Sequence, residues 1–359
     1  QSLLPLPQKV VEKLGDAWVK KENYVGNGAY KLANHIINEK IEFERNPLYW
    51  NDKETVINSA TFLAIENPST DVARYRAGDL DMTNYGLPPE QFAKLQKELP
   101  GEVYITRTLA TYSYELNNKK APFDNVNIRK ALNLSLDRNV ITDKVLGQGQ
   151  TPTYVFTPTY IEEGHLIQQP AYSKEPMAQR NEEAIKLLEE AGYSKANPLK
   201  FTILYNTNEN HKKVAIAAAS MWKANTKGLI DVKLENQEWK TYIDSRRAGR
   251  YDAARAGWNA DYNQATTFGN YFLSNSSNNT AKYANPEYDK AIAESYVATD
   301  AEGRAKAYAK AEEILAKDFG IVPIFNYVNP RLVKPYVKGY SGKDPQDHIY
   351  LRNLYIIKH

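Results

Sequence analysis

Between residues 199 and 258 the sequence alternates strand-like and helix-like segments, and this alternation restricts the fold more than any other feature. Apolar β-type runs occupy 199–205, 230–234 and 251–258. Two segments with the apolar spacing of helices, 212–227 and 239–248, separate these runs. Strands and helices that alternate in this way form a doubly wound α/β unit, so we expect the three strands to be parallel.

The carboxyl ends of the three strands indicate where a ligand would bind. In open parallel sheets, ligands bind at this edge, which we expect at 206–211, 236–239 and 258–261. Trp239 and Arg246 lie two helical turns apart on the second helix and share one face. The unit is therefore expected to gather six chemically active side chains at one edge: His211, Trp239, Arg246, Arg255, Trp258 and Asp261.

The densest part of this edge is 255–263, where a cation, an anion and two aromatic side chains are separated by small residues. Small residues let another chain approach closely, so we expect this stretch to end a buried strand and to form the floor of a binding cleft. Structural roles remain open as alternatives. Asp261 could cap a turn, and Arg255 could form a structural ion pair. Trp258 could belong to the core, and His211 could lie on the surface.

The flanking sequence predicts an α+β part at residues 1–103, and further strands and helices on both sides of the α/β unit. The first part is expected to contain strands at 26–32, 40–45, 56–64 and 79–83 and helices at 9–14, 69–76 and 89–99. The remainder is expected to contain strands at 103–117 and 321–328 and helices at 126–136, 137–147, 182–191, 285–297 and 301–317. A long loop is predicted at 148–180, and Asn181 is predicted to cap the helix that follows.

The order of these segments predicts the domain organisation. A chain of 359 residues is too long for one hydrophobic core. The chain is expected to leave one domain near residue 103 and to return to it near residue 328, and two such crossovers are typical of a hinge. We therefore expect one domain before residue 103 and after residue 328, and a second domain between them.

Composition and motifs favour binding over catalysis. The net charge of +3 gives no reason to expect nucleic acid as a partner, and no apolar run of membrane-spanning length occurs. The chain has no cysteine, and its five histidines lack the spacing of metal ligands. Neither a phosphate-binding glycine loop nor a nucleophile elbow is present. The absence of an initiator methionine and a signal peptide predicts a processed product or the removal of an upstream part.

Several long motifs point to one family. They lie at 28–30, 44–51, 74–82, 133–138, 236–240, 255–263 and 353–359. In these motifs the chain strongly resembles the periplasmic oligopeptide-binding proteins of Gram-negative bacteria, the OppA group. This group belongs to the peptide/nickel family of solute-binding proteins that serve ABC importers. The resemblance extends over essentially the whole chain.

The resemblance implies a two-lobed α/β fold of the periplasmic binding proteins, with mixed sheets and a hinge. The chain would be the carboxyl-terminal two thirds of such a protein, without part of the large lobe and without the small second domain. Residues 1–103 and 326–359 would belong to the large lobe, and 104–325 would form the second lobe. A precursor with a signal peptide, a periplasmic location, a monomer without cofactor or metal, and an inner-membrane peptide permease as partner are also implied.

The resemblance also implies a site for short peptides between the lobes. Asp261 would pair with the α-ammonium of the peptide, and Arg255, His211 and Arg246 would be candidates for its carboxylate end. Five further residues would line the cleft: Glu115, Trp239, Trp258, Asn259 and Tyr327. Members of the family can carry a cysteine pair where this chain has Ala110 and Asn259.

Three alternatives stay open from the sequence. The chain could be a related receptor for murein peptides or for a haem-type ligand, or a hydrolase that uses Glu115 and Asp261. Because one wall of the cleft is expected to be missing, the chain should bind weakly. A separate amino-terminal fragment that restores the wall would remove this weakness.

Overall fold

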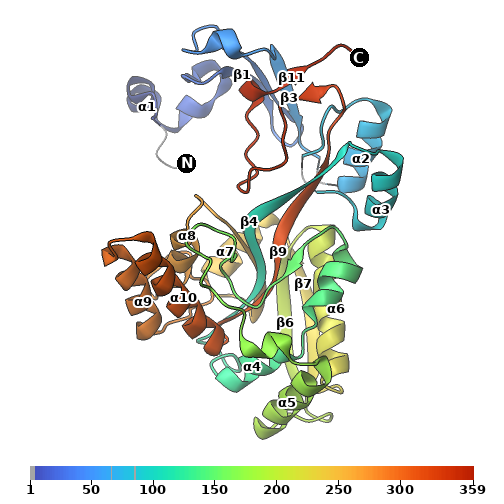
Figure 1. Cartoon of the computed structure of the whole chain (residues 1–359), viewed down its shortest axis with the longest axis vertical. Helices are drawn as coiled ribbons and strands as arrows, with labels where there is room; N and C mark the ends of the chain where they lie inside the picture. Colours follow the sequence, from blue (N-terminus) through green and yellow to red (C-terminus); the bar gives the residue numbers. More distant parts are fainter. Residues whose placement is uncertain (1–4, 66, 85) are drawn as a thin grey trace. The chain divides into compact units, whose positions relative to one another are not determined.

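The chain forms two compact units in a computed structural model that describes residues 5–65, 67–84 and 86–359. The first unit comprises Gln1–Thr106 and Asn329–His359, and the second comprises Arg107–Val328. Figure 1 shows the elements of both units along the chain. The predicted domain boundaries lie close to those of the compact units, while the identification of these parts with lobes of a larger protein stays a prediction.

The first unit combines an antiparallel sheet with three α-helices, of which α1 (Gln8–Leu14) comes first in the chain. Its sheet has the order β1-β2-β3, formed by Tyr30–Ile36, Lys40–Arg45 and Ser59–Leu63. Helices α2 (Pro68–Ala77) and α3 (Pro89–Glu98) carry most of a small buried apolar cluster. The members of this cluster are Val72, Tyr75, Leu87, Phe92, Leu95 and Leu332. This unit therefore has a core of its own.

The second unit is built on a six-stranded mixed sheet with the order β5-β9-β4-β8-β6-β7. Strands β6 (Leu199–Asn206) and β7 (Ile230–Gln237) are parallel, and β8 (Ala253–Asn259) is parallel to β6. The predicted parallel unit is therefore confirmed. The remaining strands are β4 (Val103–Leu116), β5 (Thr151–Pro152) and β9 (Ile321–Leu332), and β4 runs antiparallel to β8.

Helices cover this sheet and complete its core. In α6 (Glu209–Asn225), Trp222 is fully buried, and its indole nitrogen donates a hydrogen bond of 2.8 Å to the carbonyl oxygen of Leu132. Because Leu132 belongs to α4, this bond ties α4 to α6. The other helices of the unit are α4 (Val126–Leu134), α5 (Met177–Glu190), α7 (Trp239–Arg247), α8 (Thr266–Gly269), α9 (Pro286–Val297) and α10 (Ala301–Lys317).

Local predictions failed where a distant segment or a neighbouring proline decides the structure. The predicted strand 79–83 forms only an isolated bridge, between Met82 and Val333, because its backbone partners come from the far end of the chain. Helix α5 begins after Pro176, not at the predicted cap Asn181, and therefore shortens the predicted loop. The π-helix Val140–Leu146 ends at Gly147 in the left-handed conformation, as the sequence predicts for a helix end.

Arg138 is a buried structural cation of the second unit. Its guanidinium donates hydrogen bonds to the carbonyl oxygens of Pro323 at 2.7 Å, Thr153 at 3.0 Å and Asn133 at 3.0 Å. It also lies over the ring of Tyr154, with 4.1 Å between the guanidinium carbon and the ring centroid. These bonds join segments that are far apart in the sequence, so the packing of the unit depends on them.

We predict that Arg138→Met lowers the free energy of unfolding by at least about 3 kcal/mol, because it leaves several buried carbonyl oxygens without a donor. Unfolding in urea measures the change. The exposed Arg250→Met serves as the matched control and should change stability little. Equal stabilities of the two variants would contradict a structural role for Arg138.

Candidate functional site

The carboxyl end of β8 is built around a glycine that lets two side chains approach closely. A Cβ atom at Gly257 would lie 2.8 Å from a terminal guanidinium nitrogen of Arg255 and 3.1 Å from the hydroxyl oxygen of Tyr327. Both distances are shorter than ordinary van der Waals contacts, so a larger residue would displace these side chains. Gly257 therefore makes room for side chains of this chain itself, while the predicted approach of another chain to the stretch 255–263 stays a prediction.

Arg255 is a cation held by aromatic groups. Its guanidinium donates a hydrogen bond to the hydroxyl of Tyr327 and lies 5.1 Å from the ring centroid of Tyr112. Burial acts to lower the pKa of Arg255, but the hydroxyls of Tyr327 and Tyr242 outweigh it, so the pKa lies above its ordinary value. Within 5–65, 67–84 and 86–359, Arg255 has no ion pair, and its Nε has no hydrogen-bond partner. This arrangement suits an anionic ligand.

His211 joins the same group from the first turn of α6. The side chain of Asn208 accepts hydrogen bonds from the backbone of this turn and fixes its start. The imidazole ring of His211 lies 5.5 Å from the ring of Tyr112, centroid to centroid. Burial, and then the charge of Arg255, hold the pKa of His211 well below its ordinary value of 6.5. The ring is therefore neutral at neutral pH and can donate a single hydrogen bond.

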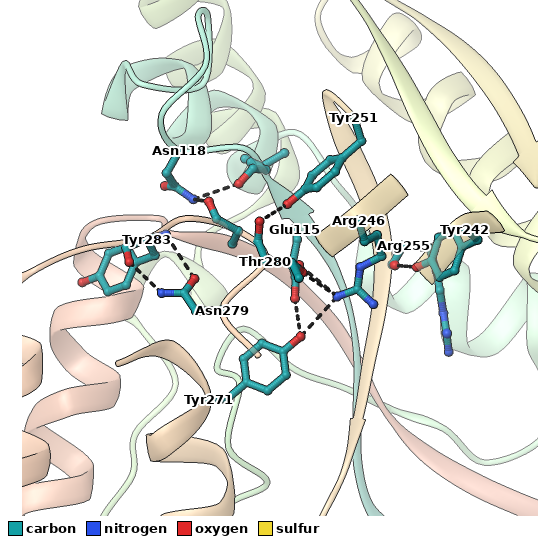
Figure 2. Close-up of polar contacts among 12 residues, drawn as sticks. Glu115, Asn118, Tyr242, Arg246, Tyr251, Arg255, Tyr271, Asn279, Thr280 and Tyr283 are labelled. Atoms are coloured by element: carbon teal, nitrogen blue, oxygen red, sulfur yellow. Dashed lines mark hydrogen bonds and ion pairs between the residues drawn. The ribbon is translucent and has the colours of Figure 1, made fainter. Parts of the chain in front are cut away.

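Glu115 and Arg246 form a separate buried network, shown in Figure 2. Their charged atoms lie 2.9 Å apart, and both side chains are almost fully buried. The hydroxyl of Tyr271 donates to Glu115 at 2.7 Å, and Arg246 donates to the hydroxyl oxygen of Thr280 at 3.0 Å. Burial alone would lower the pKa of Arg246, but Glu115 outweighs it and raises this pKa well above its ordinary value. Arg246 thus already has a carboxylate partner.

One threonine holds the start of the segment after β8. The hydroxyl oxygen of Thr267 accepts hydrogen bonds from the indole nitrogen of Trp258 at 3.3 Å and from the backbone nitrogen of Asp261 at 3.1 Å. Trp258 also packs edge-on against Tyr271, with 4.9 Å between ring centroids. Thr267 is buried, whereas the side chain of Asp261 is exposed. Thr267 therefore fixes two predicted site residues at once.

The predicted site residues fall into three neighbouring sets. Arg255, His211 and Tyr327 surround Tyr112, and Glu115 pairs with Arg246. Trp258 is connected to the Glu115 network by Tyr271. The remaining members lie at exposed positions. Asn259 is the last residue of β8, and Asp261 follows it. Trp239 lies at the start of α7, where it stacks on Tyr242 at 5.8 Å between ring centroids.

Sequence reasoning missed the buried residues that support these side chains. Tyr112 lies on β4 and contacts both Arg255 and His211, and Thr267 supports Trp258 and Asp261. The Thr- and Tyr-rich composition of 103–117 is the signal that could have indicated Tyr112. Ala110 and Asn259, at which the resemblance implies a cysteine pair in some members of the family, are direct partners in the pairing of β4 with β8.

The described part of the chain contains neither a candidate metal site nor a candidate membrane-spanning helix. Among its residues, no group of three or more histidine, cysteine, aspartate or glutamate side chains could hold a metal ion. No helix within it has the length and apolar character needed to cross a membrane.

The neutral His211 makes stability depend on pH. Because its pKa is lowered on folding, the unfolded chain binds a proton below pH 6.5 that the folded chain does not. Wild-type stability should therefore fall below pH 6.5, by about 1.4 kcal/mol per pH unit from this group. We predict that His211→Gln removes this component, measured by urea unfolding between pH 5 and pH 7.5.

The exposed His165→Gln is the control for this experiment. The stability of His165→Gln should follow the pH dependence of the wild type more closely than the stability of His211→Gln does. Parallel curves for wild type and His211→Gln would show that the depressed pKa of His211 does not contribute.

Comparison of the chain with known proteins shows the family to which it belongs. The family described as bacterial extracellular solute-binding proteins, family 5 middle, matches residues 1–280. The periplasmic oligopeptide-binding protein OppA of Haemophilus influenzae is 97% identical over 359 residues, which are all of this chain and 66% of that protein. The periplasmic murein peptide-binding protein MppA of Escherichia coli is 43% identical over 98% of this chain and 65% of its own length.

The fold of this chain is also similar to a solved structure of one of these relatives. The crystal structure of Haemophilus influenzae OppA in complex with RPPGFSPFR has a TM-score of 0.95 and 97% identity, and the match covers 99% of this chain and 70% of that one. The chain thus spans about two thirds of the length of the curated relatives it matches. The mixed α/β fold predicted from the sequence is confirmed, and the chain belongs to family 5 of the bacterial extracellular solute-binding proteins.

Proposed function

We propose that this chain binds short oligopeptides in the periplasm with little side-chain specificity, as part of a receptor that delivers them to an ABC-type peptide importer. The observation that carries the proposal is the 97% identity to a protein named for oligopeptide binding, whose solved structure contains a peptide. The family consists of solute-binding proteins and not of enzymes, which supports binding over the hydrolase alternative.

The charges of the site support opposite roles for the two ends of a peptide. Arg255 has no carboxylate partner among the described residues, and the neutral His211 lies on the same tyrosine, so this pair would receive the peptide carboxylate. Arg246 is a weaker candidate for that role, because Glu115 already balances its charge. Asp261 would receive the α-ammonium group.

The lining of the site supports tolerance of different side chains. Trp258, Trp239 and Tyr327 offer aromatic faces, which contact apolar surfaces of many shapes. Specificity would then rest on the main chain and the charged ends, which all unblocked peptides share. Asn259 would add a polar group to the lining, whereas Glu115 is fully buried and pairs with Arg246.

A murein peptide receptor is the second candidate, supported by the 43% identity to MppA. Murein peptides also carry free carboxylates, so the same cation could receive them. Competition between an unblocked tripeptide and a murein tripeptide, followed by calorimetry, separates the two. Stronger binding of the murein peptide would favour the second candidate.

We predict that acetylating the amino group of a tri- to pentapeptide weakens its binding about 100-fold, because the ammonium partner of Asp261 is lost. Asp261→Asn should weaken the unblocked peptide but leave the acetylated peptide nearly unchanged. Calorimetric titration of the chain measures both. The exposed Asp244→Asn carries the same charge change on α7 and should bind as the wild type. Equal affinities for free and acetylated peptides would exclude this role of Asp261.

Thr267→Val tests whether the threonine positions Asp261. The substitution keeps the shape of the side chain but removes the acceptor for Trp258 and Asp261. We expect the affinity for unblocked peptides to fall about tenfold, from the loss of a net hydrogen bond of roughly 1.5 kcal/mol. The affinity for acetylated peptides should change little. Thr266→Val is the matched control, because Thr266 is also buried but bonds Gln264.

A further inference from the structure

A large groove lies in the second unit among residues to which the proposed peptide site assigns no role. It has a volume of about 870 Å³ and lies among α10, the segment 166–172 and the first turn of α4, whose ribbons can be located in Figure 1. We call it the α10 groove. Pockets of this volume are in the range that holds small-molecule ligands. Its apolar surface comes from eight residues: Val126, Leu166, Pro170, Ala171, Tyr172, Ala309, Ala316 and Phe319.

The groove follows one side of α10. Its lining residues on this helix run from Lys306 to Lys317 at intervals of three and four residues, so they form one stripe along the helix. This stripe is roughly 17 Å long, from a rise of about 1.5 Å per residue. It gives an extended chain one continuous surface to lie against.

The helical wall of the groove offers little to the backbone of a peptide, because the backbone groups of α10 are bonded within the helix. On the other wall, Pro170 has no N–H group, and its carbonyl oxygen already accepts a hydrogen bond of 2.9 Å from Ser173. Gln168 and Gln169 are the polar residues of that wall. A peptide strand would lose hydrogen bonds with water and could regain them on one wall alone, whereas an alkyl chain has none to lose.

The charge around the groove favours an anion. Four lysines and one glutamate line it. Lys310 is paired with Glu294 at 3.3 Å, and Lys130 with Glu183 at 2.5 Å. Lys306 and Lys317, one at each end of the stripe, form no ion pair with any residue of 5–65, 67–84 or 86–359. Each end of an apolar groove therefore has a cation available.

We propose that the α10 groove binds an amphiphilic carboxylate with an unbranched alkyl chain, the chemistry of a fatty acid. The alkyl chain lies against the apolar surface between Tyr172 and Ala309, where its burial provides most of the free energy. The carboxylate pairs with Lys306 or Lys317 in a charge-assisted hydrogen bond. This site is separate from the proposed peptide site in its residues and in its ligand class.

Calorimetric titration of the 359-residue chain with dodecanoate, below the concentration at which the probe aggregates, tests the proposal. Dodecanoate should bind at one site, whereas butyrate and dodecyltrimethylammonium should bind much more weakly, because one lacks the chain and the other has the opposite charge. Saturation with an unblocked tripeptide should not displace dodecanoate. Displacement by the peptide, or equal binding of the cationic probe, would overturn the assignment.

Two double variants locate the site. Lys306→Glu with Lys317→Glu should weaken dodecanoate binding about tenfold or more. The control is Lys195→Glu with Lys290→Glu, which changes the same number of charges at exposed positions of the same unit outside the groove. Ala309→Phe with Ala316→Phe fills the groove without changing its charge and should abolish binding. Unchanged binding in the charge variant, with its folded state verified by circular dichroism, would refute the proposal.

Discussion

The buried ion pair between Glu115 and Arg246 fixes the arrangement of the second unit around its candidate site. The pair joins β4 to α7, and its hydrogen bonds to Tyr271 and Thr280 add a third segment of the chain. A buried charge without its partner costs several kcal/mol, so the four groups must keep their positions together. Because Tyr271 packs against Trp258, the same network also sets one wall of the site.

The regular part of the fold could be predicted because local pattern and tertiary structure agree there. Apolar runs that alternate with helical spacing define β6, α6, β7, α7 and β8, and parallel pairing then brings His211 and Arg255 to one edge. The strand predicted at 79–83 failed for the opposite reason. Its backbone pairs only briefly with residues near Val333, and no local pattern contains that information.

The supporting residues of the site could not be predicted, because their roles depend on contacts between distant segments. Helical spacing predicts that Arg246 shares a face of α7 with Trp239, but it gave no sign that Glu115, far away in the sequence, would neutralise Arg246. Thr267 is an ordinary threonine in the sequence. It becomes important only because two donors, Trp258 and the backbone of Asp261, point to its hydroxyl oxygen.

Arg246 and Arg255 lie in different electrostatic surroundings, although both are near the same edge of the sheet. Arg246 is buried against the carboxylate of Glu115, which neutralises its charge. This ion pair holds segments of the chain together. Arg255 is held by the hydroxyl of Tyr327 and the ring of Tyr112, neither of which carries a charge at neutral pH. Its positive charge is therefore positioned but not neutralised by the described part of the chain. A carboxylate that reaches Arg255 gains a charge-assisted hydrogen bond without displacing an internal anion. The same carboxylate would have to compete with Glu115 at Arg246, so the two cations differ in what they can offer an anion.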